Sequence, residues 1–311
     1  MHSIFSGVNI SNDYDEIRSW SIIITKKNNG RFMKFSKHIV TILIIVCPFI
    51  YNSCDGGLNI FSKSDDVQLG LDISTQILND PQQFPIYRAD PSVKAYINSR
   101  IFQHILASPL IESKDIYSYQ IEIIDDDSVM NAFALPGGYI YVYTGLLEYL
   151  NSEAALAGVV GHEIAHAELR HATQRMTAQY GVSVLLNLIL GENPSQIAEI
   201  ASNLFVGFAF LANSRSDESE SDKESFNYLK DTRYYPGGVK FFFEHLKADN
   251  LVSQNPGKIE TFLSTHPNPL ERISEINNLL QQANIEVRDF NSTGSGIYRD
   301  EYSVNIKNKL R

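Results

Sequence analysis

Two histidines and a glutamate in the stretch His162-Glu163-Ile164-Ala165-His166 place the strongest constraint on how this chain can fold. In a helix, residues four positions apart lie on one face with Cβ atoms roughly 5–6 Å apart, so both imidazoles can reach the same metal ion. The carboxylate of Glu163 then points about 100° round the helix, where it can take a proton from water activated by that ion. The spacing therefore predicts a zinc site with a catalytic base beside it.

The residues around this motif predict a buried helix. Residues 152–169 read SEAALAGVVGHEIAHAEL, which is apolar nearly all round, and Asn151 or Ser152 is suited to cap the N-terminus. A buried histidine pair needs polar partners, and a metal ion supplies them. Gly158 and Ala155 precede His162 on the same face and leave room for a close approach. These features favour the active-site helix of a peptidase over a chance occurrence of the motif.

The N-terminal region predicts a targeting segment rather than folded protein. Residues 1–32 resemble neither a domain nor a signal, so we expect translation to begin at Met33 and the first 32 residues to be a non-native extension. Residues 33–53 have Lys34 and Lys37 before an apolar run from Ile39 to Tyr51, which is typical of a signal peptide and too short to span a bilayer comfortably. An uncleaved membrane anchor is the alternative.

The signal ends at Ser53-Cys54, a small residue followed by cysteine, as at the cleavage site of bacterial lipoproteins. Tyr51 departs from the leucine that is usual there. We expect Cys54 to be lipidated and residues 54–64 to be a tether, which would anchor the protein to a membrane of the cell envelope, facing the periplasm. Cys47 is the only other cysteine, so the mature chain can form no disulfide, and zinc must be held by histidine and carboxylate.

The rest of the chain predicts one metallopeptidase domain over residues 65–285 and a polar C-terminal tail over 286–311. Its fold class is α+β and predominantly helical, with a small β-sheet beside the active-site helix. The formal charge of −10 argues against nucleic acid as a partner. The expected elements are a helix capped by Ser64 and ending near Asn79, a helix from Asp90-Pro91 to about Ala107, a strand over Tyr117–Ile124 and a strand or hairpin around Tyr139–Thr144.

Two segments have more than one interpretation. In zinc peptidases a substrate commonly lies extended along a strand edge above the metal, a role that residues 131–145 could serve, although an ordinary half-buried hairpin fits them equally well. Residues 180–212 contain two short apolar stretches, VSVLLNLIL and LFVGFAFLA, separated by a polar turn. This apolar hairpin is too short to span a membrane, and it could pack in the core, cover the active site or rest on a bilayer surface.

A third zinc ligand is expected from the acidic helix over residues 213–229, NSRSDESESDKESFNYL. Such a charge run is commonly a solvated face. With no cysteine nearby, however, a carboxylate from this helix is the natural way to complete a His₂Glu site that keeps a fourth position for water. Glu218 and Asp222 are four residues apart, so one can bind zinc while the other accepts the free N–H of a ligand histidine.

Four motifs in order make the chain resemble the HtpX and CAAX-prenyl-protease family of zinc metallopeptidases, in particular the envelope branch that includes BepA and the mitochondrial Oma proteases. These motifs are NAFALPGGYIYVYTGLL (131–147), GHEIAH followed by RH (161–171), SRSDESESD (214–222) and THPNPLERI (265–273). The resemblance covers roughly residues 68 to 280.

The resemblance implies a role for each matching residue. His162, His166 and Glu218 would hold one Zn²⁺ per chain, Glu163 would be the general base and acid, and Asp222 would support a ligand histidine. His266 matches the family's His-Pro, which would return to the metal and stabilise the oxyanion or cap the zinc at rest. From the sequence alone His266 would be a surface-loop residue. Three other histidines are expected to be structural: His104, His245 and His171, the last on the helix face opposite the ligands.

The sequence therefore predicts a zinc-dependent metalloendopeptidase of the bacterial cell envelope that hydrolyses polypeptides. By analogy with the family, its substrates would be unfolded or misassembled envelope proteins, as in protein quality control. A zinc-stabilised chaperone or scaffold with little proteolysis is the alternative. Glu163 favours the enzyme, because a binding protein has no need of it.

Overall fold

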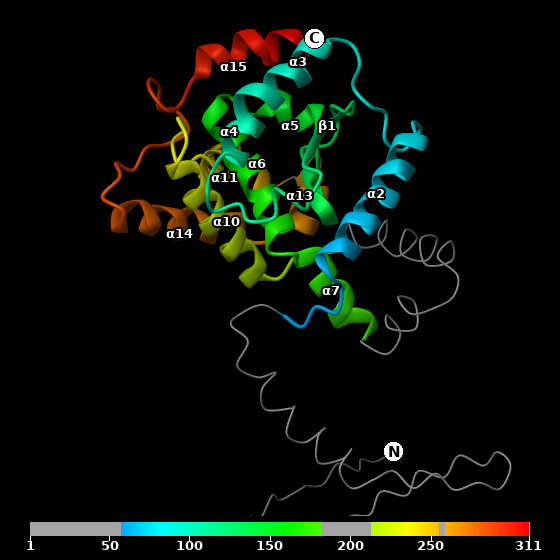
Figure 1. The fold of residues 1–311 in the computed structure, drawn as a ribbon. Coiled ribbons are helices and arrows are strands. Elements are labelled where there is room, and N and C mark those ends of the chain that lie inside the picture. The colour runs from blue at the N-terminus through cyan, green and yellow to red at the C-terminus, as the bar shows by residue number, and fades with distance from the viewer. Residues whose placement is uncertain (1–56, 182–212, 255–258, 311) are drawn as a thin grey trace, which may run out of the picture. The chain divides into compact units, whose positions relative to one another are not determined.

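The computed structural model describes residues 57–181, 213–254 and 259–310 (Figure 1). Helices predominate, and three short strands form one sheet, so the predicted α+β class is confirmed. The longer helices are α2 (Lys63–Asn79), α6 (Glu153–Glu168), α7 (His171–Tyr180), α10 (Arg215–Lys230), α11 (Val239–Ala248) and α14 (Pro269–Gln282). The shorter ones are α3 (Pro91–Tyr96), the π-helix η1 (Ile97–Phe102), α4 (Gln103–Leu106), η2 (Pro136–Gly138), α5 (Thr144–Tyr149), α12 (Leu251–Gln254), α13 (Glu260–Thr265), α15 (Arg299–Asn305) and η4 (Lys307–Lys309).

The predicted extension over residues 1–32, the signal peptide over 33–53 and Cys54 lie outside the described residues. So does the apolar hairpin, apart from its first two residues, Tyr180 and Gly181. Within the described ranges, none of the helices combines the length and the apolar character that a bilayer span requires.

The sheet has the strand order β1-β3-β2. Its central strand, β3 (Tyr139–Tyr143), is buried along its whole length, with β1 (Gln120–Ile124) parallel on one side and β2 (Ala132–Leu135) antiparallel on the other. Gly137 and Gly138, at φ 75° and 93°, turn the chain between β2 and β3, which explains the Gly-Gly pair. Among the described residues no strand pairs with the outer edge of β2.

Helix α6 lies in the middle of the core. All of its residues from Glu153 to Ala167 are buried, and the Ser152 side chain caps it by accepting a hydrogen bond from the Ala155 amide at 3.2 Å. Gly158 makes the predicted close approach possible, because a Cβ atom there would lie 2.0 Å from the backbone nitrogen of Val239 at the start of α11. The small residues of α6 therefore bring neighbouring helices close to the predicted zinc-binding face.

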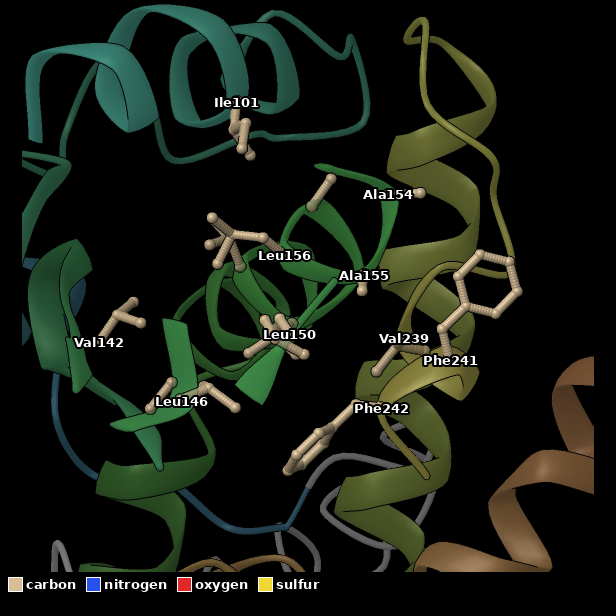
Figure 2. Close-up of a cluster of buried hydrophobic side chains, with 14 of the residues drawn as sticks. Ile101, Val142, Leu146, Leu150, Ala154, Ala155, Leu156, Val239, Phe241 and Phe242 are labelled. Carbon is tan, nitrogen blue, oxygen red and sulfur yellow. The ribbon is translucent and has the colours of Figure 1, made fainter. Parts of the chain in front are cut away.

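The core around α6 draws on helices and strands from the whole domain (Figure 2). Ile101 of η1, Val142 of β3, Leu146 of α5 and Phe242 of α11 are each at most 1% exposed and belong to the same cluster as Leu156 of α6. Burial on this scale holds α6 in one orientation, and each fully buried side chain of this size contributes roughly 1.5–3 kcal/mol.

The start of α2 differs from the prediction. Ser62, and not Ser64, is the N-cap, because its hydroxyl accepts from the Asp65 amide while the Asp65 carboxylate accepts from the Ser62 amide. This reciprocal arrangement satisfies two backbone donors at once and outcompetes a simple cap. The expected cap at Asp90 is confirmed, with its side chain bonded to the Ser92 amide.

The C-terminal residues pack with the domain instead of forming the separate polar tail predicted over residues 286–311. Ile297, Tyr302 and Ile306 are fully buried in the core cluster. The carbonyl groups of Ile297 and Tyr298 also accept hydrogen bonds from the first amides of α6, at 3.1 and 3.3 Å. This packing could not be predicted from the sequence, because three apolar side chains in a polar stretch make no periodic pattern.

We predict that Tyr302→Ala lowers the free energy of unfolding by about 3–5 kcal/mol, because it empties a fully buried site. Tyr302→Phe should lower the free energy of unfolding by about 1 kcal/mol, because it removes the hydrogen bond that the Tyr302 hydroxyl donates to the Leu147 carbonyl. Urea unfolding measures both values. Val304→Ala, on the same helix but 60% exposed, is the control and should stay within about 0.5 kcal/mol of wild type. An equal, small effect of all three would mean that α15 is not part of the cooperative core.

Candidate metal centre

Three separate helical segments bring four potential metal ligands together. His162 and His166 come from α6, Glu218 from the first turn of α10, and His266 from the end of α13. One donor atom from each lies within 4.8 Å of those of the others, and all four side chains are buried. The structure thus brings these four side chains together, and His266 is buried rather than exposed on a surface loop.

The donor atoms are spaced as a tetrahedral zinc site requires. The Nε2 atoms of His162 and His166 are 2.9 Å apart, and the Glu218 carboxylate oxygens lie 3.4 and 3.3 Å from them. Ligands about 2.0–2.1 Å from zinc at tetrahedral angles are about 3.3 Å apart. Two imidazole nitrogens that face each other also repel unless a proton or a cation lies between them. Both the donor set and its spacing therefore fit a zinc ion.

Asp222 and Arg272 lie directly behind these ligands. Asp222 accepts from Nδ1 of His162 at 2.9 Å, the support expected for a ligand histidine. The Arg272 guanidinium of α14 donates to both oxygens of Asp222, at 2.6 and 2.7 Å, and to Glu218 at 2.5 Å. One arginine therefore neutralises and orients both carboxylates of α10.

His171 is in contact with a predicted ligand, contrary to its expected place on the opposite helix face. Helix α6 ends at Glu168, and Arg170 takes a left-handed conformation at φ 62°, which turns the chain so that α7 begins at His171. The Nδ1 atoms of His171 and His166 are 2.8 Å apart. Burial lowers the pKa of His171 to about 4, so it is neutral and can accept this hydrogen bond, which leaves Nε2 of His166 for a metal ion.

Glu163 faces a cavity that two of the four potential ligands, His166 and His266, also line. A carboxylate oxygen of Glu163 lies 3.6 Å from Nε2 of His266, whose ring stacks on Phe262. The cavity is lined by residues of α6, of α7 and of the edge strand β2, and by Asn213, Thr265 and His266. It therefore places an acid–base group and a histidine next to the possible ligands, with a strand edge alongside.

Charge compensation sets the protonation of the site. Burial acts to raise the pKa of Glu218, but the charges of His266 and Arg272 outweigh burial and hold this pKa low. At Asp222, Arg272 outweighs burial in the same way and holds the pKa low. Burial raises the pKa of Glu163, which moves it toward the range of a general base that works near neutral pH. At His162 burial and Arg272 act to lower the pKa, yet Glu218 and Asp222 raise it to about 9.

Three residues of this centre were not predicted: Arg272, His171 and Asn213, whose amide donates to Glu218 at 2.6 Å. The role of Arg272 could have been predicted from the sequence, because two carboxylates buried together need a cation and this arginine lies in the THPNPLERI motif. The contact of His171 depends on the left-handed turn at Arg170, which no pattern indicates. Nothing in the sequence indicates the contact of Asn213 with Glu218, apart from the position of Asn213 directly before the N-cap of α10.

We predict that zinc binding displaces a proton from His162. Its pKa of about 9 keeps the metal-free protein protonated there at neutral pH, and a metal ligand must be neutral. Apparent zinc affinity should therefore rise about tenfold per pH unit up to about pH 9 and level off above it. Competition with a chromophoric chelator over this pH range measures the slope.

Asp222→Asn is the matched variant, because it removes one of the carboxylates that raise the pKa of His162 and should move the plateau to lower pH. An affinity independent of pH between about 7 and 9 in wild type would show that His162 is already neutral.

Comparison with known proteins agrees with this centre. The model of peptidase family M48 matches residues 91–280, which include all four potential ligands, Asp222 and Arg272. The mitochondrial metalloendopeptidase OMA1 of Schizosaccharomyces pombe is 28% identical over 189 residues, 60% of this chain and 53% of the relative. The metalloprotease YcaL of Escherichia coli is 30% identical over 166 residues, 51% of this chain and 60% of the relative.

The beta-barrel assembly-enhancing protease of Escherichia coli is 26% identical over 202 residues, 62% of this chain and 40% of the relative. The matched part thus spans between 40% and 60% of the length of these three relatives. Because the family model covers more than half of the chain, this protein belongs to peptidase family M48.

Proposed function

We propose that this protein is a zinc-dependent metalloendopeptidase in which His162, His166 and Glu218 hold the ion and Glu163 transfers the proton. The observation that carries the proposal is the position of the buried Glu163 carboxylate, which opens on a cavity beside three donors with tetrahedral spacing. When bound there, zinc supplies Lewis-acid chemistry, which polarises a carbonyl and lowers the pKa of water.

The residues of the chain carry out the proton transfers. Glu163, with its pKa raised by burial, takes the proton from the attacking water and later delivers it to the leaving amine. Asp222 and Arg272 hold His162 and Glu218 in place, and His171 does the same for His166. His266, 3.6 Å from Glu163, is placed to stabilise the oxyanion or to occupy the fourth ligand position at rest.

The position of the edge strand β2 favours a polypeptide as the substrate. Phe133, Ala134 and Leu135 line the same cavity as Glu163, and the outer edge of β2 pairs with no described strand. A peptide added to this edge would be bound through its main chain, so recognition would depend little on sequence. Such binding suits unfolded or misassembled proteins, and by analogy with the bacterial relatives we propose those of the cell envelope as substrates.

A zinc-stabilised chaperone or scaffold is the second candidate, because an edge strand can bind extended clients without cleaving them. Glu163 argues against it, since burial of a carboxylate is costly and a binding protein gains nothing from it.

We predict that Glu163→Gln abolishes hydrolysis of an unfolded protein such as casein while zinc stays bound, because the amide cannot take a proton. Glu218→Ala should instead lower zinc occupancy, since it removes a ligand and leaves Arg272 paired with Asp222 alone. Activity and zinc content are measured together on purified protein from Asp55 onward.

Glu271→Ala is the control, because that carboxylate is 65% exposed on α14, and it should change neither value. Full zinc occupancy in Glu218→Ala would overturn the ligand assignment. Zinc binding without cleavage in wild type would favour the chaperone.

We further propose that a lipid on Cys54 holds the protein on an envelope membrane. Cys54→Ala in the full-length chain should then release the protein from membranes that have been washed at high pH, and the mass of the wild-type N-terminus should include the lipid. A membrane-bound variant that retains residues 33–53 would indicate the uncleaved anchor instead.

A further inference from the structure

Three arginines lie at the metal centre or its cavity, and two of them have partners. Arg272 is bound by Glu218 and Asp222, and Arg170 donates to Asp66 and to the Phe61 carbonyl. Arg175, on α7, lines the cavity together with Glu163 and His166. Its Nε and Nη1 atoms are shielded from solvent and have no hydrogen-bond acceptor among the residues that the structure describes.

Shielding two nitrogens of a guanidinium is costly when no acceptor replaces the water that they lose. Three carboxylates act on Arg175 electrostatically, those of Asp217, Glu218 and Glu163, and each is already engaged. Asp217 caps the start of α10, Glu218 is bound by Arg272, and Glu163 is the proposed base. The positive charge at Arg175 is therefore left for a group that enters the cavity.

A group that enters the cavity and pairs with Arg175 would lie close to Glu163, the proposed base. Arg175 lies one helical turn after His171, whose ring contacts His166. The cavity that it lines continues to β2 and to His266. A peptide that follows the edge of β2 and reaches Glu163 must place a side chain or its own end in this cavity.

We infer that Arg175 is a specificity-determining residue that binds a carboxylate of the peptide substrate near the scissile bond. A planar guanidinium pairs best with a carboxylate, and a protein with a net charge of −10 repels acidic peptides unless a local cation compensates. The carboxylate can belong to an aspartate or glutamate side chain or to the C-terminus of the peptide. The inference rests on the proposed peptidase function.

The test uses pairs of quenched fluorescent peptides that differ only in glutamate or glutamine at one position within about three residues of the scissile bond. A further pair has a free or an amidated C-terminus. For one pair, wild type should show a kcat/KM about 10- to 100-fold higher for the carboxylate form, the range expected of a hydrogen bond to a charged group shielded from water.

Arg175→Gln should remove this preference by slowing only the carboxylate peptide, and its turnover of the neutral peptide shows that it is folded. Arg175→Lys should keep part of the preference. Arg215→Gln is the matched control, because Arg215 is 75% exposed on α10, and it should keep all of it.

Equal rates for both members of every pair in wild type, or a preference that persists in Arg175→Gln, would overturn the inference while leaving the peptidase function intact. So would an equal loss on both peptides in Arg175→Gln, which indicates a structural role. Affinities of the same peptides for Glu163→Gln protein, with and without Arg175→Gln, decide the matter even if wild type cleaves none of them. In that case the function fails, and the carboxylate preference is judged from binding alone.

Discussion

The pairing of Arg272 with Glu218 and Asp222 is the interaction on which the rest of the centre depends. Both carboxylates are about 1% exposed, and without a cation neither could remain ionised at that depth. Because Arg272 is on α14 and the acids are on α10, the same interaction joins these two helices behind the histidines of α6. Breaking a buried pair of this kind costs about 3–5 kcal/mol, so the pairing holds both carboxylates of α10 against α14.

Close packing around α6 fixes the position of the histidines, in addition to the ion pairs of Arg272. Helix α6 is buried on all sides, and Gly158 lets the start of α11 approach until no side chain fits between them. A catalytic constellation held on a rigid helix needs little reorganisation when a substrate arrives. The cavity lies at the border of this rigid part, where residues of α7 and β2 line it.

The sequence predicted the parts that local rules determine. Asp90 was identified as a cap, Ser152 as one of two candidate caps with Asn151, and α6 as buried, because spacing and chemistry are short-range properties. Spacing left Glu218 and Asp222 as alternative ligands, and the family resemblance indicated Glu218. Errors arose where distant residues decide the outcome. Three buried side chains near the C-terminus pack under α6, and a left-handed residue at Arg170 redirects His171. That two nitrogens of Arg175 lack an acceptor among the described residues likewise cannot be predicted until its neighbours are known.

The ligands are far apart along a chain that has no cysteine after Cys54. Glu218 and His266, for example, are 48 positions apart and come from different helices. A metal ion held by both, and by α6, closes long loops as a disulfide does, and the entropy of closing a loop depends only weakly on its length. The ion would then cross-link segments that contain no cysteine among the described residues, so its loss would loosen the connections among α6, α10 and α13 as well as remove the proposed catalysis.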